Sequence, residues 1–173
     1  MNRSKKNMKP QDVVVLLKII ALGDQPWYHH TLAQSLGISQ SEVTESLNRS
    51  RFSGLINAER KQVSRLSLLD FIRYGIKYAF PEQPGAVVRG VPTAHAALPL
   101  SKEIQSQEAF VWPDSAGKVR GQAIEPLYRS VPQAVQEDPQ LYALLALVDA
   151  FRVGRVREQQ LAVQHLQQIF HHG

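Results

Sequence analysis

The chain has 173 residues, with 20 Lys and Arg, 15 Asp and Glu, no Cys and a formal net charge of +5 at pH 7. Hydrophobic residues make up 43% of the sequence, enough to bury a core, so the composition excludes an intrinsically disordered chain. The absence of Cys excludes a disulfide-stapled scaffold, a thiol nucleophile and a zinc site built on thiolates. The longest uncharged apolar run, at 141–148, is far shorter than the roughly 20 residues that cross a bilayer, so we expect no membrane partner.

The amino terminus has the outline of a signal peptide, with a basic segment at 1–9 before an apolar segment at 13–22. Lys18 interrupts the apolar segment, however, and no small-residue cleavage site follows it before Asp24. The apolar positions recur at helical spacing, which predicts a buried amphipathic helix behind a short basic tail. We therefore expect a cytoplasmic, nucleoid-associated protein.

Charge is unevenly distributed along the chain. Residues 1–80 carry 12 Lys and Arg against 6 Asp and Glu, whereas residues 81–173 carry 8 against 9. A basic first half suggests a polyanionic partner, and an ordinary solvated basic surface is the alternative.

The first half shows the start and stop signals of several helices. Pro10 is typical of a first helical position and Gly23 of a helix end. Ser67 and Asp70 form a further capping pair. The predicted elements are helices at 10–22, 31–36, 39–52 and 67–80, and a small hairpin at 55–66.

The Pro- and Gly-containing segment 81–85 marks a boundary, and the pattern beyond it is less regular. Three β-prone segments, at 86–91, 109–112 and 118–121, are separated by prolines. Because proline cannot donate to a strand ladder, we expect extended edge segments rather than a full sheet. Two helices are predicted to follow, at 139–153 and 155–170.

The segment Thr31–Ile56 has the spacing that a helix-turn-helix needs. Leu32 and Leu36 anchor its first helix, and Ala33 is small where two helices must approach each other closely. Gly37 permits the positive φ of a tight turn, and Ser39 with Glu42 forms a capping box that begins the second helix. With Val43 and Leu47 facing inward, the opposite face is short and polar, a shape that fits a major groove. That face consists of Gln40, Ser41, Thr44, Glu45 and Asn48.

The stretch LAQSLGISQSEVTESL, followed by the GLI of Gly54–Ile56, resembles the winged helix-turn-helix regulators of the MarR and Lrp type. The resemblance covers residues 10–80. It implies that Ser39–Phe52 is a recognition helix and that Glu59–Gln62 is the tip of a wing. Ser50 stands where such proteins usually carry Leu, so we expect Phe52 to fill that space.

These observations predict a mainly α protein with an N-terminal winged helix-turn-helix domain (1–80) and a C-terminal helical effector and dimerisation domain with a few short strands (81–173). The predicted function is that of a sequence-specific transcriptional regulator, typically a repressor, which binds double-stranded DNA as a homodimer. The residues expected to contact bases are Ser39, Gln40, Ser41, Thr44, Glu45 and Asn48, and those expected to hold phosphates are Arg49, Arg51, Arg60 and Lys61.

The predicted helix at 139–153 is apolar nearly all round, so more than one side of it must be covered. We expect a second subunit to provide part of that cover, through Leu141, Leu144, Leu145, Val148 and Phe151.

The middle of the chain, 86–124, mixes aromatic and cationic residues. A pocket for a small anionic effector, formed by Arg89, His95, Trp112 and Arg120, is one hypothesis. The alternative is that the aromatic side chains belong to the core and the charges are solvated.

No motif supports catalysis, a cofactor or a metal. No pair of His has the i, i+4 spacing of a metal-binding helix, no Gly-rich loop matches a nucleotide fingerprint, and no Ser lies in a nucleophile elbow. We expect a protein that is not an enzyme. The alternative function is a protein-interaction adaptor, such as an antitoxin-like or complex-assembly subunit, with its protein partner at the C-terminal domain.

Overall fold

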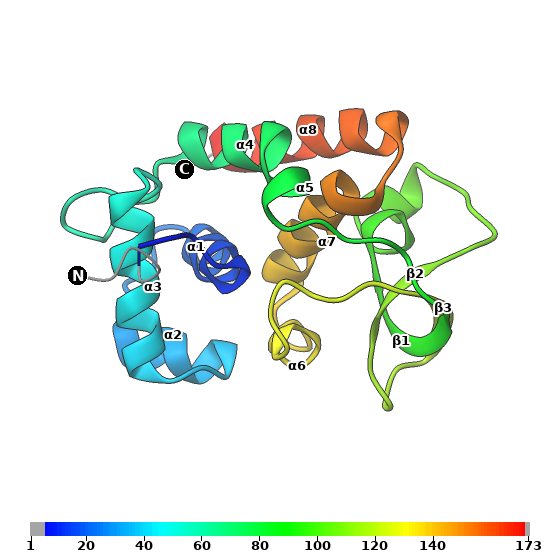
Figure 1. Cartoon of the computed structure of the whole chain (residues 1–173), viewed down its shortest axis with the longest axis horizontal. Coiled ribbons are helices and arrows are strands. Elements are labelled where there is room, and N and C mark those ends of the chain that lie inside the picture. Colours follow the sequence, from blue (N-terminus) through cyan, green and yellow to red (C-terminus); the bar gives the residue numbers. More distant parts are fainter. Residues whose placement is uncertain (1–5, 172–173) are drawn as a thin grey trace.

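The computed structural model describes residues 6–171 and shows eight α-helices and three strands in that range (Figure 1). The first half holds only helices, whereas the sheet lies entirely in the second half. The elements are α1 (Pro10–Leu22), α2 (His29–Leu36), α3 (Gln40–Phe52), α4 (Arg65–Tyr74), α5 (Ile76–Ala79), β1 (Val87–Thr93), β2 (Phe110–Pro113), β3 (Val119–Ala123), α6 (Val131–Ala134), α7 (Pro139–Val153) and α8 (Val156–His171), with two short 3-10 helices, η2 (Ala94–Ala96) and η3 (Leu100–Lys102).

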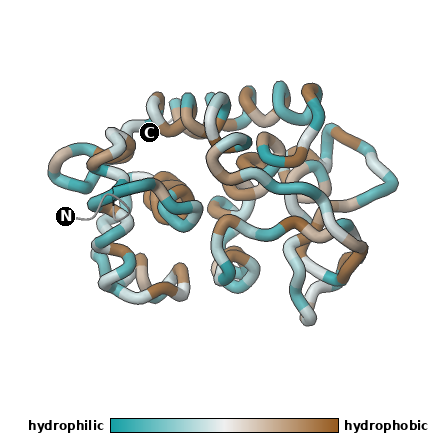
Figure 2. Tube along the Cα trace, viewed as in Figure 1, coloured by the Kyte–Doolittle hydropathy of each residue, from teal (hydrophilic) through white to brown (hydrophobic). Residues whose placement is uncertain are grey.

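Helix α1 lies at the centre of the molecule, between α3 and α7, and carries much of the hydrophobic colour in Figure 2. Its side chains from Asp12 to Leu17 are all buried, because α3 covers one side of the helix and α7 covers another. Helix α2 packs on α1 and α3, so these three helices form a compact unit. The basic tail expected before α1 lies partly outside the described residues.

The three strands close into a very small barrel. Strand β1 pairs antiparallel with both β2 and β3, and a short parallel pairing of β2 with β3 completes the ring. Such a small barrel forces backbones close together. A Cβ atom at Gly90 would overlap the backbone of Trp112, and one at Gly121 would overlap the backbone of Ala109. Glycine is therefore required at both positions.

The fold class predicted from the sequence is wrong, although its coarser part, a mainly α chain with a few strands, is correct. A winged helix requires a β-hairpin after its recognition helix. Here the segment 55–66 contains a single isolated bridge, between Ile56 and Val63, and no strand precedes Val87 in the described chain. The strands instead form the closed barrel of the second half, so that half is not a helical domain with loose edge segments.

The predicted dimerisation face is also wrong. The side chains of Leu141, Leu144, Leu145, Val148 and Phe151 are each at most 3% exposed within one chain. Helix α7 packs against α1, α4, α5, α8, β1 and η2, so its own chain provides the cover on every side. These residues have no surface left to offer to a second subunit.

The buried residues form one continuous hydrophobic cluster that extends from Val13 in α1 to Phe170 in α8. The cluster contains residues from both sides of the predicted boundary at 81–85, packed together. Within the described residues, no helix is both long and apolar enough to cross a membrane.

Candidate nucleic-acid interface

The turn between α2 and α3 has the predicted left-handed glycine and serine cap, but only half of the predicted capping box: among the described residues the Glu42 carboxylate accepts no hydrogen bond from the Ser39 N–H. Gly37 ends α2 in the left-handed region, with φ 66° and ψ 34°. The Ser39 hydroxyl accepts a hydrogen bond from the Glu42 backbone N–H at 3.1 Å and so caps the amino end of α3. Leu32 and Ala33 are buried, so α2 lies on the rest of the unit as expected. Helices α2 and α3 thus form a helix-turn-helix supported by α1.

The outer face of α3 is polar and open to solvent. Val43 and Leu47 are fully buried on the inner side, whereas Gln40, Ser41 and Glu45 are exposed. Ser39 is exposed beside them, and Thr44 and Asn48 are half-buried on the same face. The structure therefore brings together all six side chains that were expected to contact bases.

Two residues from outside α3 hold the middle of this face in place. The Thr44 hydroxyl donates to the backbone carbonyl of Gln40 and lies 2.9 Å from His29 Nδ1. Asn48 Oδ1 accepts from Arg60 Nη1 at 2.9 Å. Burial, and then the charge of Arg60, lower the pKa of His29, which favours the neutral ring.

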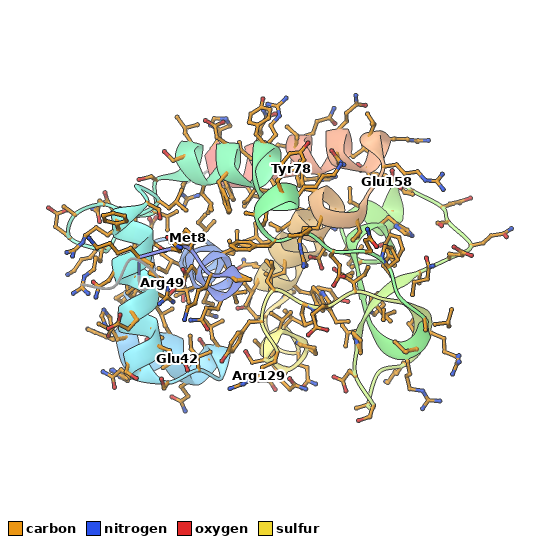
Figure 3. All side chains as sticks on the ribbon, viewed as in Figure 1. Met8, Glu42, Arg49, Tyr78, Arg129 and Glu158 are labelled. Carbon is orange, nitrogen blue, oxygen red and sulfur yellow. The ribbon has the colours of Figure 1, made fainter. Side chains whose placement is uncertain are left out.

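Arg49 is not a phosphate ligand. Its guanidinium is 5% exposed and makes a two-pronged ion pair with Asp12, through Nε at 2.8 Å and Nη2 at 2.7 Å. Arg49 is labelled on α3 in Figure 3. Hydrogen bonding to Asp12 raises the pKa of Arg49 further above its ordinary value. The pair locks α3 onto α1, and DNA has no access to it. The sequence carries little signal for this pair, because Asp12 stands in the first turn of α1, where an acid is ordinarily a cap. Only its burial shows that it needs a charged partner.

The other expected phosphate ligands lie at the carboxyl end of α3. Arg51 and Lys61 are exposed, whereas Arg60 is half-buried and has a positive φ of 58°. Phe52 does not fill the space beside Ser50: its ring is 66% exposed, and Lys6 Nζ lies 4.8 Å from the ring centroid. Exposed cations therefore gather at the end of α3 and on the adjoining turn.

A groove of about 920 Å³ separates this turn from the loop between α1 and α2. Trp27 and His29 line it on one side, and Arg60 and Lys61 line it on the other. The groove reaches the outer face of α3 through the contacts of His29 and Arg60 with that helix. The cationic and aromatic surface thus continues beyond α3.

The expected effector pocket does not exist as one site. His95 and Trp112 are buried, and their ring nitrogens contact Glu108 O at 2.7 Å and Asp149 Oδ2 at 2.8 Å. Arg89 and Arg120 are exposed and lie opposite each other on β1 and β3. Two of the four side chains are thus buried and two are exposed to solvent, so the alternative interpretation, core aromatics and solvated charges, fits the structure.

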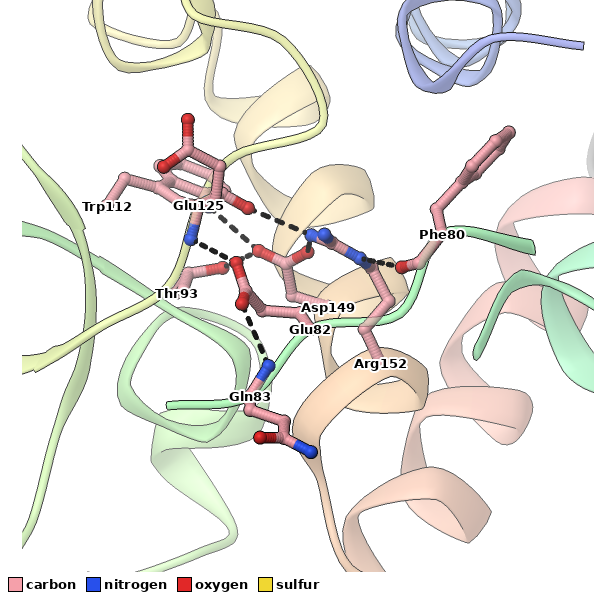
Figure 4. A network of polar contacts seen from close by, with 8 residues as sticks. All are labelled: Phe80, Glu82, Gln83, Thr93, Trp112, Glu125, Asp149 and Arg152. Atoms are coloured by element: carbon pink, nitrogen blue, oxygen red, sulfur yellow. Dashed lines mark hydrogen bonds and ion pairs between the residues drawn. The ribbon is translucent and has the colours of Figure 1, made fainter. Parts of the chain in front are cut away.

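The Trp112 contact belongs to a buried polar network around Asp149 (Figure 4). Asp149 also accepts from Thr93 Oγ1 at 2.7 Å and from Arg152 Nη1 at 2.9 Å, and Arg152 donates to the carbonyls of Phe80 and Glu125. Burial raises the pKa of the Asp149 carboxyl, while Arg152 and the two neutral donors lower it. All three groups that face the carboxylate are donors, so the network ties α7 to the barrel and leaves no open position for a ligand.

Comparison of the chain with known proteins found no match among family models, curated proteins or solved structures.

Proposed function

We propose that the protein binds double-stranded DNA through the outer face of α3. The observation that carries the proposal is the orientation of this helix. Its inner side packs on α1 and α2 and is locked by the Arg49–Asp12 pair, while its outer side presents amide, hydroxyl and carboxylate groups to solvent. An amide on an exposed recognition helix can pair bidentately with adenine in the major groove. Gln40, at the amino end of α3, is the side chain we assign to that contact.

The charge distribution supports the same partner. Residues 1–80 carry a formal charge of +6, from 12 Lys and Arg minus 6 Asp and Glu, and residues 81–173 carry −1. Arg51, in the last turn of α3, and Lys61, on the turn that follows, are exposed cations that would hold phosphates. On this basis the protein acts as a transcriptional regulator, and a homodimer would place two copies of α3 on half-sites about one helical turn apart.

Selection of binding sites from a random pool of duplexes tests the proposal directly. We expect a preferred sequence to emerge, and Gln40→Ala to lose about 1–3 kcal/mol of discrimination at one base position of it. Gln160→Ala, an exposed glutamine on α8, is the matched control and should leave every position unchanged. A pool that shows no enrichment, or equal effects of both variants, would rule out α3 as a base-contacting helix.

Protein docking is the second candidate function, and the surface of α4, α5 and α8 favours it. Tyr74 and Val156 are 63% and 69% exposed and line one shallow groove between α4 and α8, and Tyr78 on α5 is 78% exposed. A stable complex with a different protein, together with no retention of duplex DNA at physiological salt, would favour this function over DNA binding.

A further inference from the structure

The segment just before α6, residues 128–130, belongs to the second half of the chain but is fastened to the helix-turn-helix. The Ser130 hydroxyl donates to the carbonyl of Leu36, the last residue of α2, at 2.5 Å. The Tyr128 hydroxyl lies 3.4 Å from the carboxylate of Glu42, in the first turn of α3. At the turn itself, a Cβ atom on Gly37 would lie 3.4 Å from Ser130 Cβ. The segment therefore touches both helices and the turn between them.

Arg129 lies between these two attachment points and is exposed to solvent. Its guanidinium carbon lies 5.4 Å from the centroid of the Tyr128 ring, so the side chain is supported by the ring that reaches α3. Figure 3 shows Arg129 and Glu42 at the same end of the molecule, the end at which α3 begins. The contacts of its two neighbours thus fix the position of Arg129 in the chain beside the amino end of α3.

Resting on the proposed function, we propose that Arg129 contacts a DNA phosphate when α3 occupies the major groove. Residues at the amino end of a recognition helix approach the base edges, so a side chain next to that end meets the sugar–phosphate backbone at the border of the groove. Arginine suits this role because its planar fork can bind a phosphate through two hydrogen bonds. The nearby carboxylate of Glu42 would repel a phosphate, and the Tyr128 hydroxyl beside it offers that carboxylate a donor within the protein.

This contact would make the DNA surface a joint product of the two halves of the chain. The sequence alone did not identify Arg129, because it lies far from the recognition helix along the chain. Its neighbour Tyr128 is 86 residues from Glu42, and only the fold brings the two side chains together.

The test is a salt series with the full chain and a labelled random-sequence duplex. Arg129→Gln should lower the log–log salt slope by about 0.9, the value for one lost phosphate contact, and should weaken binding to all sequences alike. Arg157→Gln removes the same charge from an exposed position on α8 and should leave the slope unchanged. Arg129→Lys keeps the charge and should retain the slope.

The outcomes separate the two proposals. Wild-type binding with the same slope for Arg129→Gln as for wild type overturns the role of Arg129 and leaves the proposed function intact. Equal losses of slope in Arg129→Gln and Arg157→Gln also overturn it, because the effect would then follow net charge alone. If the wild-type chain retains no duplex at any salt concentration, the proposed function fails and the Arg129 contact fails with it.

Discussion

Arg49 has a structural role on the helix that we propose to enter DNA. Its guanidinium and the carboxylate of Asp12 are buried together as an ion pair, and the carboxylate also accepts from the Lys9 backbone N–H at 2.8 Å. Because the position of α3 relative to α1 depends on this pair, Arg49 acts on the candidate interface only through the orientation of the helix. Arg51, two residues further on, is exposed and carries no such constraint.

Arg49→Ala should therefore lower the free energy of unfolding by about 3–5 kcal/mol, because it leaves a buried carboxylate without its partner. Urea unfolding followed by circular dichroism measures the change. Arg51→Ala is the control on the same helix and should change stability by no more than about 0.5 kcal/mol. Replacing both partners with apolar residues, Asp12→Leu with Arg49→Met, should recover much of the loss. Equal stability of the two single variants would contradict the structural role of Arg49.

At the scale of single residues, the sequence predicted the outer face of α3 well, because helical periodicity determines which side chains share a face. It failed for Arg49 because periodicity does not show what a charged side chain pairs with across 37 positions of sequence. The sequence also predicted wrongly that Phe52 fills the space beside Ser50, because local spacing does not show which of the two side chains turns inward. Ser50 is buried with its hydroxyl unpaired among the described residues, a tolerated defect that no local pattern reveals.

At the scale of elements, the contact of α2 with its neighbours depends on a small residue. Ala33 is 8% exposed, whereas the next residue, Gln34, faces solvent. Ala33→Leu should overpack the contact and cost about 1–3 kcal/mol, with a lower melting temperature and weaker retention of DNA. Gln34→Leu places the same side chain on the exposed side and should melt close to wild type. Thermal unfolding of the two variants checks the expectation, and identical melting temperatures would show that α2 is rotated from the position described.

Helix α7 shows where element-scale reasoning stops. Its sequence predicted correctly that more than one side is covered, since nearly all its side chains are apolar. The same sequence carries no information on whether the cover comes from the same chain or from another. Part of the cover comes from α1, at the opposite end of the sequence, and the barrel could not be predicted because its pairings join segments separated by prolines.

At the scale of the whole molecule, side chains from one half repeatedly bind the other. Lys18 pairs with Asp138 at 2.6 Å, Arg65 donates to the carbonyls of Ile169 and Phe170, and Arg152 donates to the carbonyl of Phe80. The single hydrophobic cluster runs through the same region. These contacts argue for one cooperative structure, although the sequence predicted two domains that divide after residue 80.

Denaturant unfolding should accordingly show one transition. Trp27→Phe leaves Trp112, buried beside Asp149, as the only tryptophan and thus as a fluorescent probe of the second half. Its fluorescence should change at the same denaturant concentration as the circular dichroism of all the helices. Two separated midpoints would instead show that residues 1–80 and 81–173 unfold as independent domains.

The close packing at Gly90 and Gly121 limits how this sequence can diverge. No side chain fits at either position, since even a methyl group would overlap backbone atoms that the strand pairing holds in place. Descendants of this chain that keep the barrel must therefore keep both glycines, while exposed strand positions such as Val87 and Arg89 remain free to change. In diverged sequences with this barrel, the two glycines would then remain identical after most other positions of the second half have changed, and they would be the best positions by which to identify common ancestry.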